Sequence, residues 1–264
     1  MPLVFAGITP HPPLLIPTVG KEQAIAQLEK TKTGFEQLEK DLYLAKPHII
    51  VVISPHEGIF QDAFVVNAHT SFTGSFEAFG DLVTKHEWNG SADLAAKISH
   101  VGNTSNLAIR LVSEPKLDYG TSIPLCYLTP HLPGVKILPI GFSGLAPADH
   151  IAFGEILKEV FVSYGKRVAV IASGDLSHCV TPEGPAPFSQ AGSSFDTTII
   201  DALTRNQISI IEQINPDVVQ ASHECGYRSI LILLGVLKEM NYTFHLHSYE
   251  YPFGIGYLVG NFVF

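Results

Sequence analysis

The chain has 264 residues, enough for a large α/β domain with a substantial core, and its formal net charge is −9. It contains no run of like charges, which argues against binding to nucleic acid or to an anionic membrane surface, because phosphates require clustered lysine and arginine. The longest apolar stretches are too short to span a bilayer.

The cysteine content and the amino terminus bear on the cellular compartment. Cys126, Cys179 and Cys225 are an odd number at no disulfide-framework spacing, and no basic segment followed by an apolar one opens the chain. We therefore expect a cytoplasmic protein with reduced thiols. The apolar fraction is 46% and the mean hydropathy is +0.23, which favours a large core or a homo-oligomer.

In the first half of the chain, apolar runs alternate with amphipathic segments. The patterns predict a strand at 2–8, an amphipathic helix at 21–44, a buried strand at 48–54 parallel to the first, and an edge strand at 62–68. PHPPLLIP, after the first strand, predicts a rigid loop, because proline cannot continue a strand ladder.

The second half continues this alternation. We expect helices at 91–102, 147–164, 193–204, 207–213 and 225–240, and strands at 107–113, 135–141, 167–173, 242–249 and 255–263. The last two strands predict a hairpin around 252–254. LDYGTSIPLCYL predicts a turn at Gly120 that leads into a helix, and 175–192 a long, functional loop. Alternating strands and helices indicate an α/β fold.

Three histidines each follow a predicted strand: His11, His56 and His178. Ligands of open α/β sheets bind beyond the carboxyl ends of the strands, so these imidazoles are expected to face one crevice. With the carboxylate of Glu224, two of them would complete a 2-His-1-carboxylate metal site.

Each candidate has an alternative interpretation. His11 and His56 lie in proline-stiffened loops that suit ligands, yet either could be an ordinary core histidine. Glu224 could simply be a first-turn glutamate favoured by the helix dipole, and Cys225 could be a buried thiol or a ligand for zinc or copper. His178 suits general acid–base work, although it could be a third metal ligand.

The motifs PHPPLLIP, SPH, DYGTSIPL, SGDLSH and ECG occur in this order along nearly the whole chain. Together they resemble the superfamily of class III extradiol ring-cleavage dioxygenases in its B-type subunits, and most closely its AmmeMemoRadiSam system protein B, or Memo-like, branch. The resemblance implies one domain over residues 1–264. Its fold would be a three-layer α/β/α sandwich around a mixed, largely parallel sheet.

The resemblance also implies an activity and a set of site residues. It implies a non-heme Fe(II)-dependent extradiol dioxygenase acting on a small aromatic diol and dioxygen. His11, His56 and Glu224 would hold the metal, with Cys225 as a competitor of Glu224, and His178 would be the catalytic histidine. Zinc, copper or manganese are alternatives to iron.

Tyr119 departs from the pattern of many ring-cleaving members, which have histidine at this position of the motif. A phenol, with a reference pKa near 10, can donate a proton but is a poor base at neutral pH. Two other functions therefore stay open: a metal-dependent hydrolase, and a Memo-like metal-binding protein that acts with a radical-SAM system partner.

Overall fold

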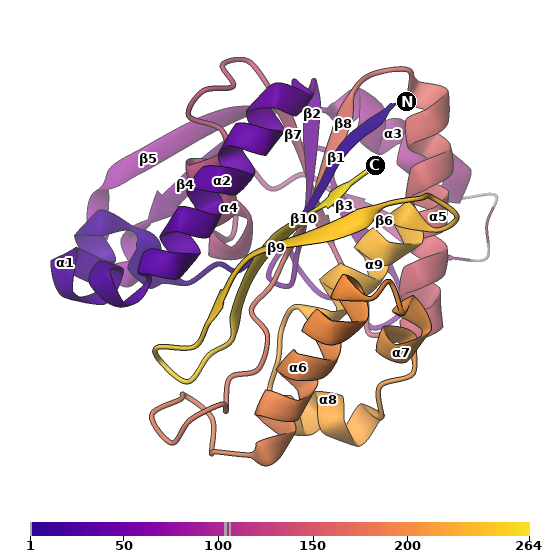
Figure 1. The fold of residues 1–264 in the computed structure, drawn as a ribbon. Coiled ribbons are helices and arrows are strands. Elements are labelled where there is room, and N and C mark those ends of the chain that lie inside the picture. The colour runs from indigo at the N-terminus through magenta and orange to yellow at the C-terminus, as the bar shows by residue number, and fades with distance from the viewer. Residues whose placement is uncertain (1, 103–104, 106) are drawn as a thin grey trace.

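The computed structural model describes residues 2–102, 105 and 107–264. Within these residues, ten strands form one sheet with helices on both faces (Figure 1). The strands are Leu3–Thr9 (β1), Ile49–Ser54 (β2), Phe64–Asn67 (β3), Ser71–Phe76 (β4), Asp81–Gly90 (β5), Ile109–Val112 (β6), Lys136–Gly141 (β7), Val168–Ser173 (β8), Thr243–Glu250 (β9) and Tyr257–Val263 (β10). The helices are Pro13–Leu15 (η1, 3-10), Pro17–Gln27 (α1), Glu29–Ala45 (α2), Glu77–Phe79 (η2, 3-10), Ala92–Gly102 (α3), Tyr119–Leu128 (α4), Pro147–Tyr164 (α5), Gln190–Thr204 (α6), Ile208–Glu212 (α7), Pro216–Ser222 (α8) and Tyr227–Leu237 (α9).

The sheet is mixed, with parallel strands at its centre. Its order is β4-β5-β7-β2-β8-β1-β10-β9, and β3 joins through β7 and β6. Strands β7, β2, β8 and β1 run parallel, whereas β10 and β9 are antiparallel at one edge. The predicted mixed, largely parallel sheet and the closing hairpin are thus confirmed.

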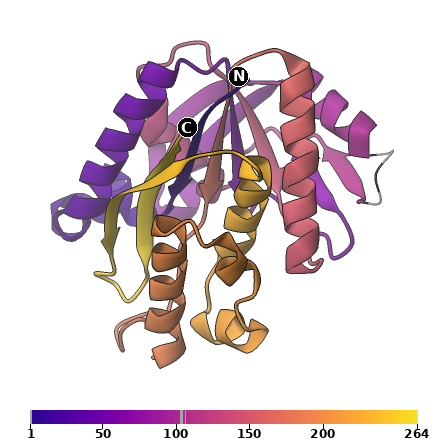
Figure 2. The same ribbon diagram turned by 45° about the vertical axis from the view of Figure 1, so that its right-hand side comes forward.

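Two apolar cores lie on opposite faces of the sheet, which makes the architecture three-layered (Figure 2). Helices α2 and α4 cover one face, and α3, α5, α6 and α9 cover the other. Strand β8 serves both cores: Val168 and Val170 belong to one, while Ala169 and Ile171 belong to the other. Burial on both faces explains why the central strands are continuous apolar runs.

Two predicted elements differ from the structure. The single helix expected at 21–44 is two helices, α1 and α2, that meet at Leu28. Within the first, Lys21 has a positive φ of 51° that interrupts the helical path. The strand expected at an edge is β3, which is fully buried and pairs with both β6 and β7. Its apolar and polar alternation therefore did not indicate one exposed face.

Three elements were not anticipated: β4, β5 and α8. The hairpin of β4 and β5 is polar, and only one face of β4 is buried, so its apolar pattern is sparse. None of the helices in the described part of the chain is long and apolar enough to cross a membrane.

Candidate metal centre

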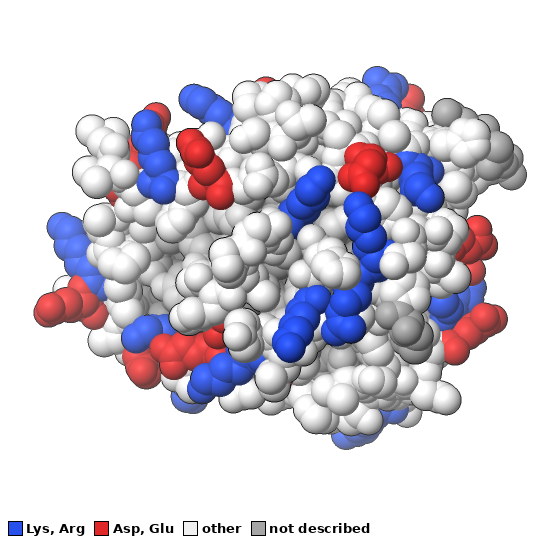
Figure 3. Space-filling view, turned by 90° about the horizontal axis from the view of Figure 1, so that it is seen from above, with Lys and Arg blue, Asp and Glu red and all other residues white. Residues whose placement is uncertain are grey.

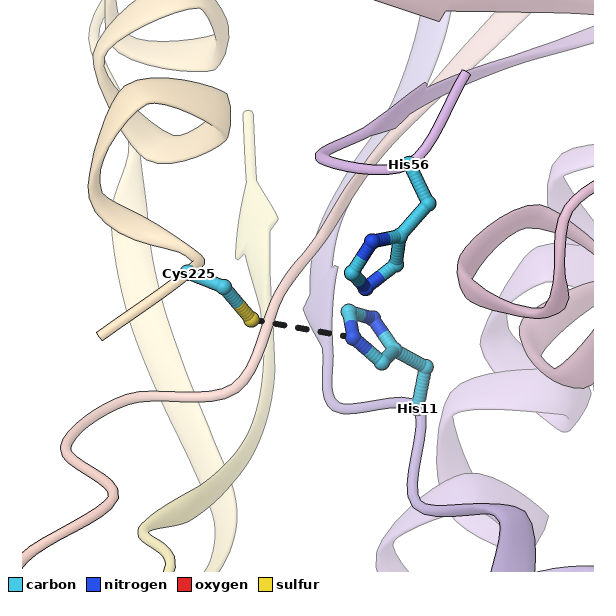
Figure 4. A group of neighbouring side chains, drawn as sticks. All are labelled: His11, His56 and Cys225. Atoms are coloured by element: carbon cyan, nitrogen blue, oxygen red, sulfur yellow. Dashed lines mark hydrogen bonds between the residues drawn. The ribbon is translucent and has the colours of Figure 1, made fainter. Parts of the chain in front are cut away.

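Three potential metal ligands converge beyond the carboxyl ends of the central strands: His11, His56 and Cys225 (Figure 4). His11 follows β1, His56 follows β2, and Cys225 lies just before α9. Their ligand atoms all lie within 4.8 Å of one another. Cys225 Sγ is 3.7 Å from His11 Nε2, and the two imidazole centroids are 5.1 Å apart.

The orientation of the His11 ring follows from its hydrogen bonds. Ser173 Oγ lies 2.5 Å from the carbonyl oxygen of Gly120, to which it donates its only proton. It must therefore accept from His11 Nδ1, 2.9 Å away, which leaves the lone pair of His11 on Nε2, next to Cys225. Burial lowers the pKa of His11 to about 4, so the ring is neutral at pH 7.

Asp175 joins the two sides of the centre. Its Oδ1 accepts the backbone N–H of His11 at 2.8 Å, and its own N–H donates to Cys225 Sγ at 3.2 Å. Burial raises the pKa of this carboxyl, against the opposing effects of the His11 N–H, His178 and His56. Burial, followed by the charge of Asp175, also raises the pKa of the Cys225 thiol well above its usual value. A metal at this sulfur would have to displace its proton.

His56 forms the solvent-exposed side of the centre. Its backbone N–H donates to Ser54 Oγ at 3.2 Å, and this hydroxyl donates to Asp118 Oδ1 at 2.7 Å. Asp118 also accepts the N–H of Thr121, which caps helix α4. These bonds fix the loop after β2 against the start of that helix.

Tyr119 packs on both histidines. Its ring stacks on that of His56 with centroids 4.3 Å apart, and it meets His11 edge-on at 5.4 Å. Phe79, at the end of η2, packs edge-on against Tyr119 at 5.3 Å. Burial, then the charges of Cys225 and Asp175, raise the pKa of Tyr119 to about 12. This phenol stays protonated and can donate a hydrogen bond.

His178 lies within the same cluster of groups. One of its ligand atoms falls within 4.8 Å of those of Asp175 and Cys225. Its Nδ1 is 3.1 Å from the carbonyl oxygen of Leu176, which can only accept, so Nδ1 carries the proton and Nε2 the lone pair. Burial lowers the pKa of His178, partly offset by Asp175, so this imidazole is neutral at pH 7.

Glu224 is not among the side chains that converge on His11 and His56. Its carboxylate accepts the backbone N–H of Tyr227 at 2.6 Å, at the start of α9. It also lines a cavity of about 430 Å³ together with His223 and Arg228. This capping matches the alternative interpretation of Glu224, and the neighbouring Cys225 stands where a third ligand was expected.

The sequence did not reveal the roles of Ser173 and Phe79. Ser173 was visible only as part of the motif SGDLSH, and nothing in its type indicated a bond to His11. Phe79 belongs to the unpredicted hairpin region, far from the other site residues in sequence. No local pattern could have assigned either.

Comparison with known proteins gives relatives of several kinds. A protein of Clostridium acetobutylicum, CA_C1420, is 29% identical over 95% of this chain, which spans 55% of that relative, about half its length. The 2-aminophenol 1,6-dioxygenase beta subunit of a Pseudomonas species is 23% identical, over 96% of this chain and 92% of its own. A 2,3-dihydroxyphenylpropionate/2,3-dihydroxicinnamic acid 1,2-dioxygenase of Klebsiella pneumoniae is 27% identical over 64% of this chain and 54% of its own.

The crystal structure of the uncharacterized Escherichia coli K12 protein JW3007 has the same fold. Its TM-score is 0.70 at 16% identity, covering 99% of this chain and 100% of that one. Residues 6–260 match the family of the catalytic LigB subunit of aromatic ring-opening dioxygenase. The match includes all the side chains of the centre described above, and the chain belongs to this LigB family.

Proposed function

We propose that this chain is an extradiol, ring-opening dioxygenase that holds Fe(II) with His11, His56 and Cys225. The observation that carries the proposal is the convergence of these three side chains, next to His178, in a member of the LigB family. The relatives named above as dioxygenases favour this function over the hydrolase and the Memo-like hypotheses. The homo-oligomer and the radical-SAM partner stay predictions.

The donor set fits a divalent transition metal. His11 is neutral with a lone pair on Nε2, as a metal ligand must be, and the Cys225 sulfur lies 3.7 Å from that atom. Sulfur in place of a carboxylate also suits zinc or copper, so iron is the choice that the ring-opening family favours. When bound, ferrous iron would orient a diol and dioxygen and carry electron density between them.

Two protein groups would then handle protons. Nε2 of His178 bears the lone pair and suits accepting a proton from a hydroxyl group of the substrate. The phenol of Tyr119 keeps its own proton and can only donate a hydrogen bond at neutral pH. His178 is therefore the base and Tyr119 the orienting donor, which assigns the two catalytic residues different tasks.

The test begins with protein purified without oxygen. Its metal content is measured, Fe(II) is added, and oxygen uptake is followed with a panel of catechols. We expect consumption of dioxygen in proportion to ring-opened product. Stoichiometric zinc, with no oxygen uptake after iron loading, would contradict the proposal.

Replacing the base tests its role. His178→Ala should retain metal but lose roughly 10²- to 10⁴-fold in turnover, the usual contribution of a general base. His131→Ala, at an exposed loop position, is the matched control and should change neither. A loss of metal from His178→Ala equal to its loss of turnover would instead identify His178 as a ligand.

A further inference from the structure

The charged groups around the metal centre are acidic residues and histidines. Asp118 acts electrostatically on both His11 and His56, and Asp175 acts on His56 and His178. Glu57, next to His56, is hydrogen-bonded to Asn67 at 2.5 Å and feels the charge of Asp118. The fields at the centre therefore favour positive charge.

Lysine and arginine are missing from this environment within the described residues. None of their side chains hydrogen-bonds to the histidines or carboxylates of the centre, and none shifts the pKa of His11, His56, His178, Tyr119 or Asp175. Arg228, on the first turn of α9, acts on Glu224 and lies over the ring of Phe142, 5.6 Å from its centroid.

The cations lie elsewhere. They gather on the opposite end of the molecule, above the amino-terminal ends of the parallel strands (Figure 3). There Lys136 and Lys166 line a cavity of about 500 Å³. Charge is thus divided along the strand direction, with the metal centre at the acidic end.

The open side of the centre is aromatic. His11 is 1% exposed, whereas His56 is exposed and carries the stacked ring of Tyr119. Phe79 lies beyond Tyr119 and is 36% exposed, so it stands at the mouth of the centre. The faces of such rings attract cations and offer no partner to a carboxylate.

We propose that this site selects a catechol whose side chain carries a protonated amine over a neutral one, and discriminates against a side chain that carries a carboxylate. The selection rests on the proposed function, since a diol must first bind at the metal. A carboxylate entering past Phe79 and Tyr119 would lose water, find no cation, and meet the field of Asp118 and Asp175. An ammonium group would meet two aromatic rings and the same field with favourable sign.

Three catechols of similar size test the selection: 4-(2-aminoethyl)catechol, 4-propylcatechol and 3-(3,4-dihydroxyphenyl)propionate. Binding to the iron-loaded protein is measured by calorimetry without oxygen, so that turnover plays no part. We expect the amine to bind about tenfold more tightly than the carboxylate, as a steered charge difference permits, with the propyl compound between them. Added salt should narrow the ratio.

The outcomes separate the two proposals. Equal or tighter binding of the carboxylate would overturn the selection while leaving the dioxygenase function standing. If none of the three catechols binds to fully metal-loaded protein, both proposals are wrong.

A charge placed at the mouth gives a second test. Phe79→Arg should erase or reverse the preference, whereas Val83→Arg, 86% exposed in the same hairpin, should leave it unchanged. Should Phe79→Arg fail to fold, Phe79→Leu keeps an apolar side chain without the aromatic face, and should weaken amine binding alone by roughly threefold. An unchanged preference in the folded Phe79 variants would contradict the role of this residue.

Discussion

At the scale of single residues, hydrogen bonds fix which imidazole nitrogen is free. Ser173 receives the Nδ1 proton of His11, and the carbonyl of Leu176 receives that of His178. Both rings therefore present Nε2 to the centre, one as a ligand atom and the other as a base. Such supporting bonds commonly matter about as much as the ligand itself.

Ser173→Ala removes the acceptor of the His11 Nδ1 proton. We expect metal affinity to fall by roughly 10- to 100-fold, the usual cost of losing a partner that orients a ligand. Competition with a chelator measures the affinity. Ser248→Ala removes another buried hydroxyl, one without a hydrogen-bond partner, and should leave the affinity unchanged. An equal loss in both variants would assign the effect to general destabilisation.

Residues 224 and 225 can be distinguished by metal-linked stability. A metal at 100 times its dissociation constant stabilises the folded state by about 2.7 kcal/mol. Cys225→Ala should abolish this gain, and Glu224→Gln should keep it, because the Glu224 carboxylate faces the start of α9. Urea unfolding with and without metal measures both. The reverse result would restore Glu224 as the ligand.

At the scale of elements, the packing of α9 holds Cys225 in place. Helices α5 and α9 meet backbone to backbone at Gly154 and Gly235, where an added Cβ on Gly235 would approach the Ile151 carbonyl oxygen to 2.2 Å. This contact fixes the height of α9 over the sheet. The segment before it then carries the sulfur to the end of β8.

Gly235→Ala tests this packing. The added methyl group meets backbone that cannot rotate away, so we expect a destabilisation of about 1–3 kcal/mol despite the better helix propensity of alanine. Chemical denaturation measures the change. Val162→Ala, on an exposed part of α5, should cost less than about 0.5 kcal/mol. Unchanged stability of Gly235→Ala would show that the helices can separate freely.

At the scale of the whole molecule, the buried histidines make stability depend on pH. The folded state holds the pKa of His11 at about 4, below the 6.5 of the ordinary group. Between these values the unfolded chain binds a proton that the folded protein does not. The stability of the metal-free protein should therefore fall as the pH drops through this window, and His11 should add nothing above it. Asp196, whose pKa burial raises to about 6, acts in the opposite direction.

A difference measurement isolates His11. Between pH 7 and pH 5, the metal-free parent should lose about 2 kcal/mol more unfolding free energy than His11→Gln, since each proton contributes about 1.4 kcal/mol per pH unit. His86→Gln, at an exposed position, should follow the parent. A parallel pH dependence of the parent and His11→Gln would mean that His11 is protonated as readily when folded as when unfolded.

Much of the fold and part of the site could be predicted from the sequence alone. Strands β1, β2 and β8 are continuous apolar runs bounded by proline or glycine, and a histidine follows each of them. Apolar periodicity is a local property, and parallel strands bring their carboxyl ends together. His11 and His56 could therefore be placed in one crevice before any coordinate was known.

Only the tertiary structure decided which neighbour of residue 224 faces the centre. Glu224 and Cys225 are adjacent and both could bind a metal, but the carboxylate bonds to the start of its own helix, while the sulfur turns toward His11. The β4–β5 hairpin likewise delivers Phe79 to Tyr119 across a long sequence separation. Side-chain direction at a helix start and long-range contacts depend on packing, which no local pattern encodes.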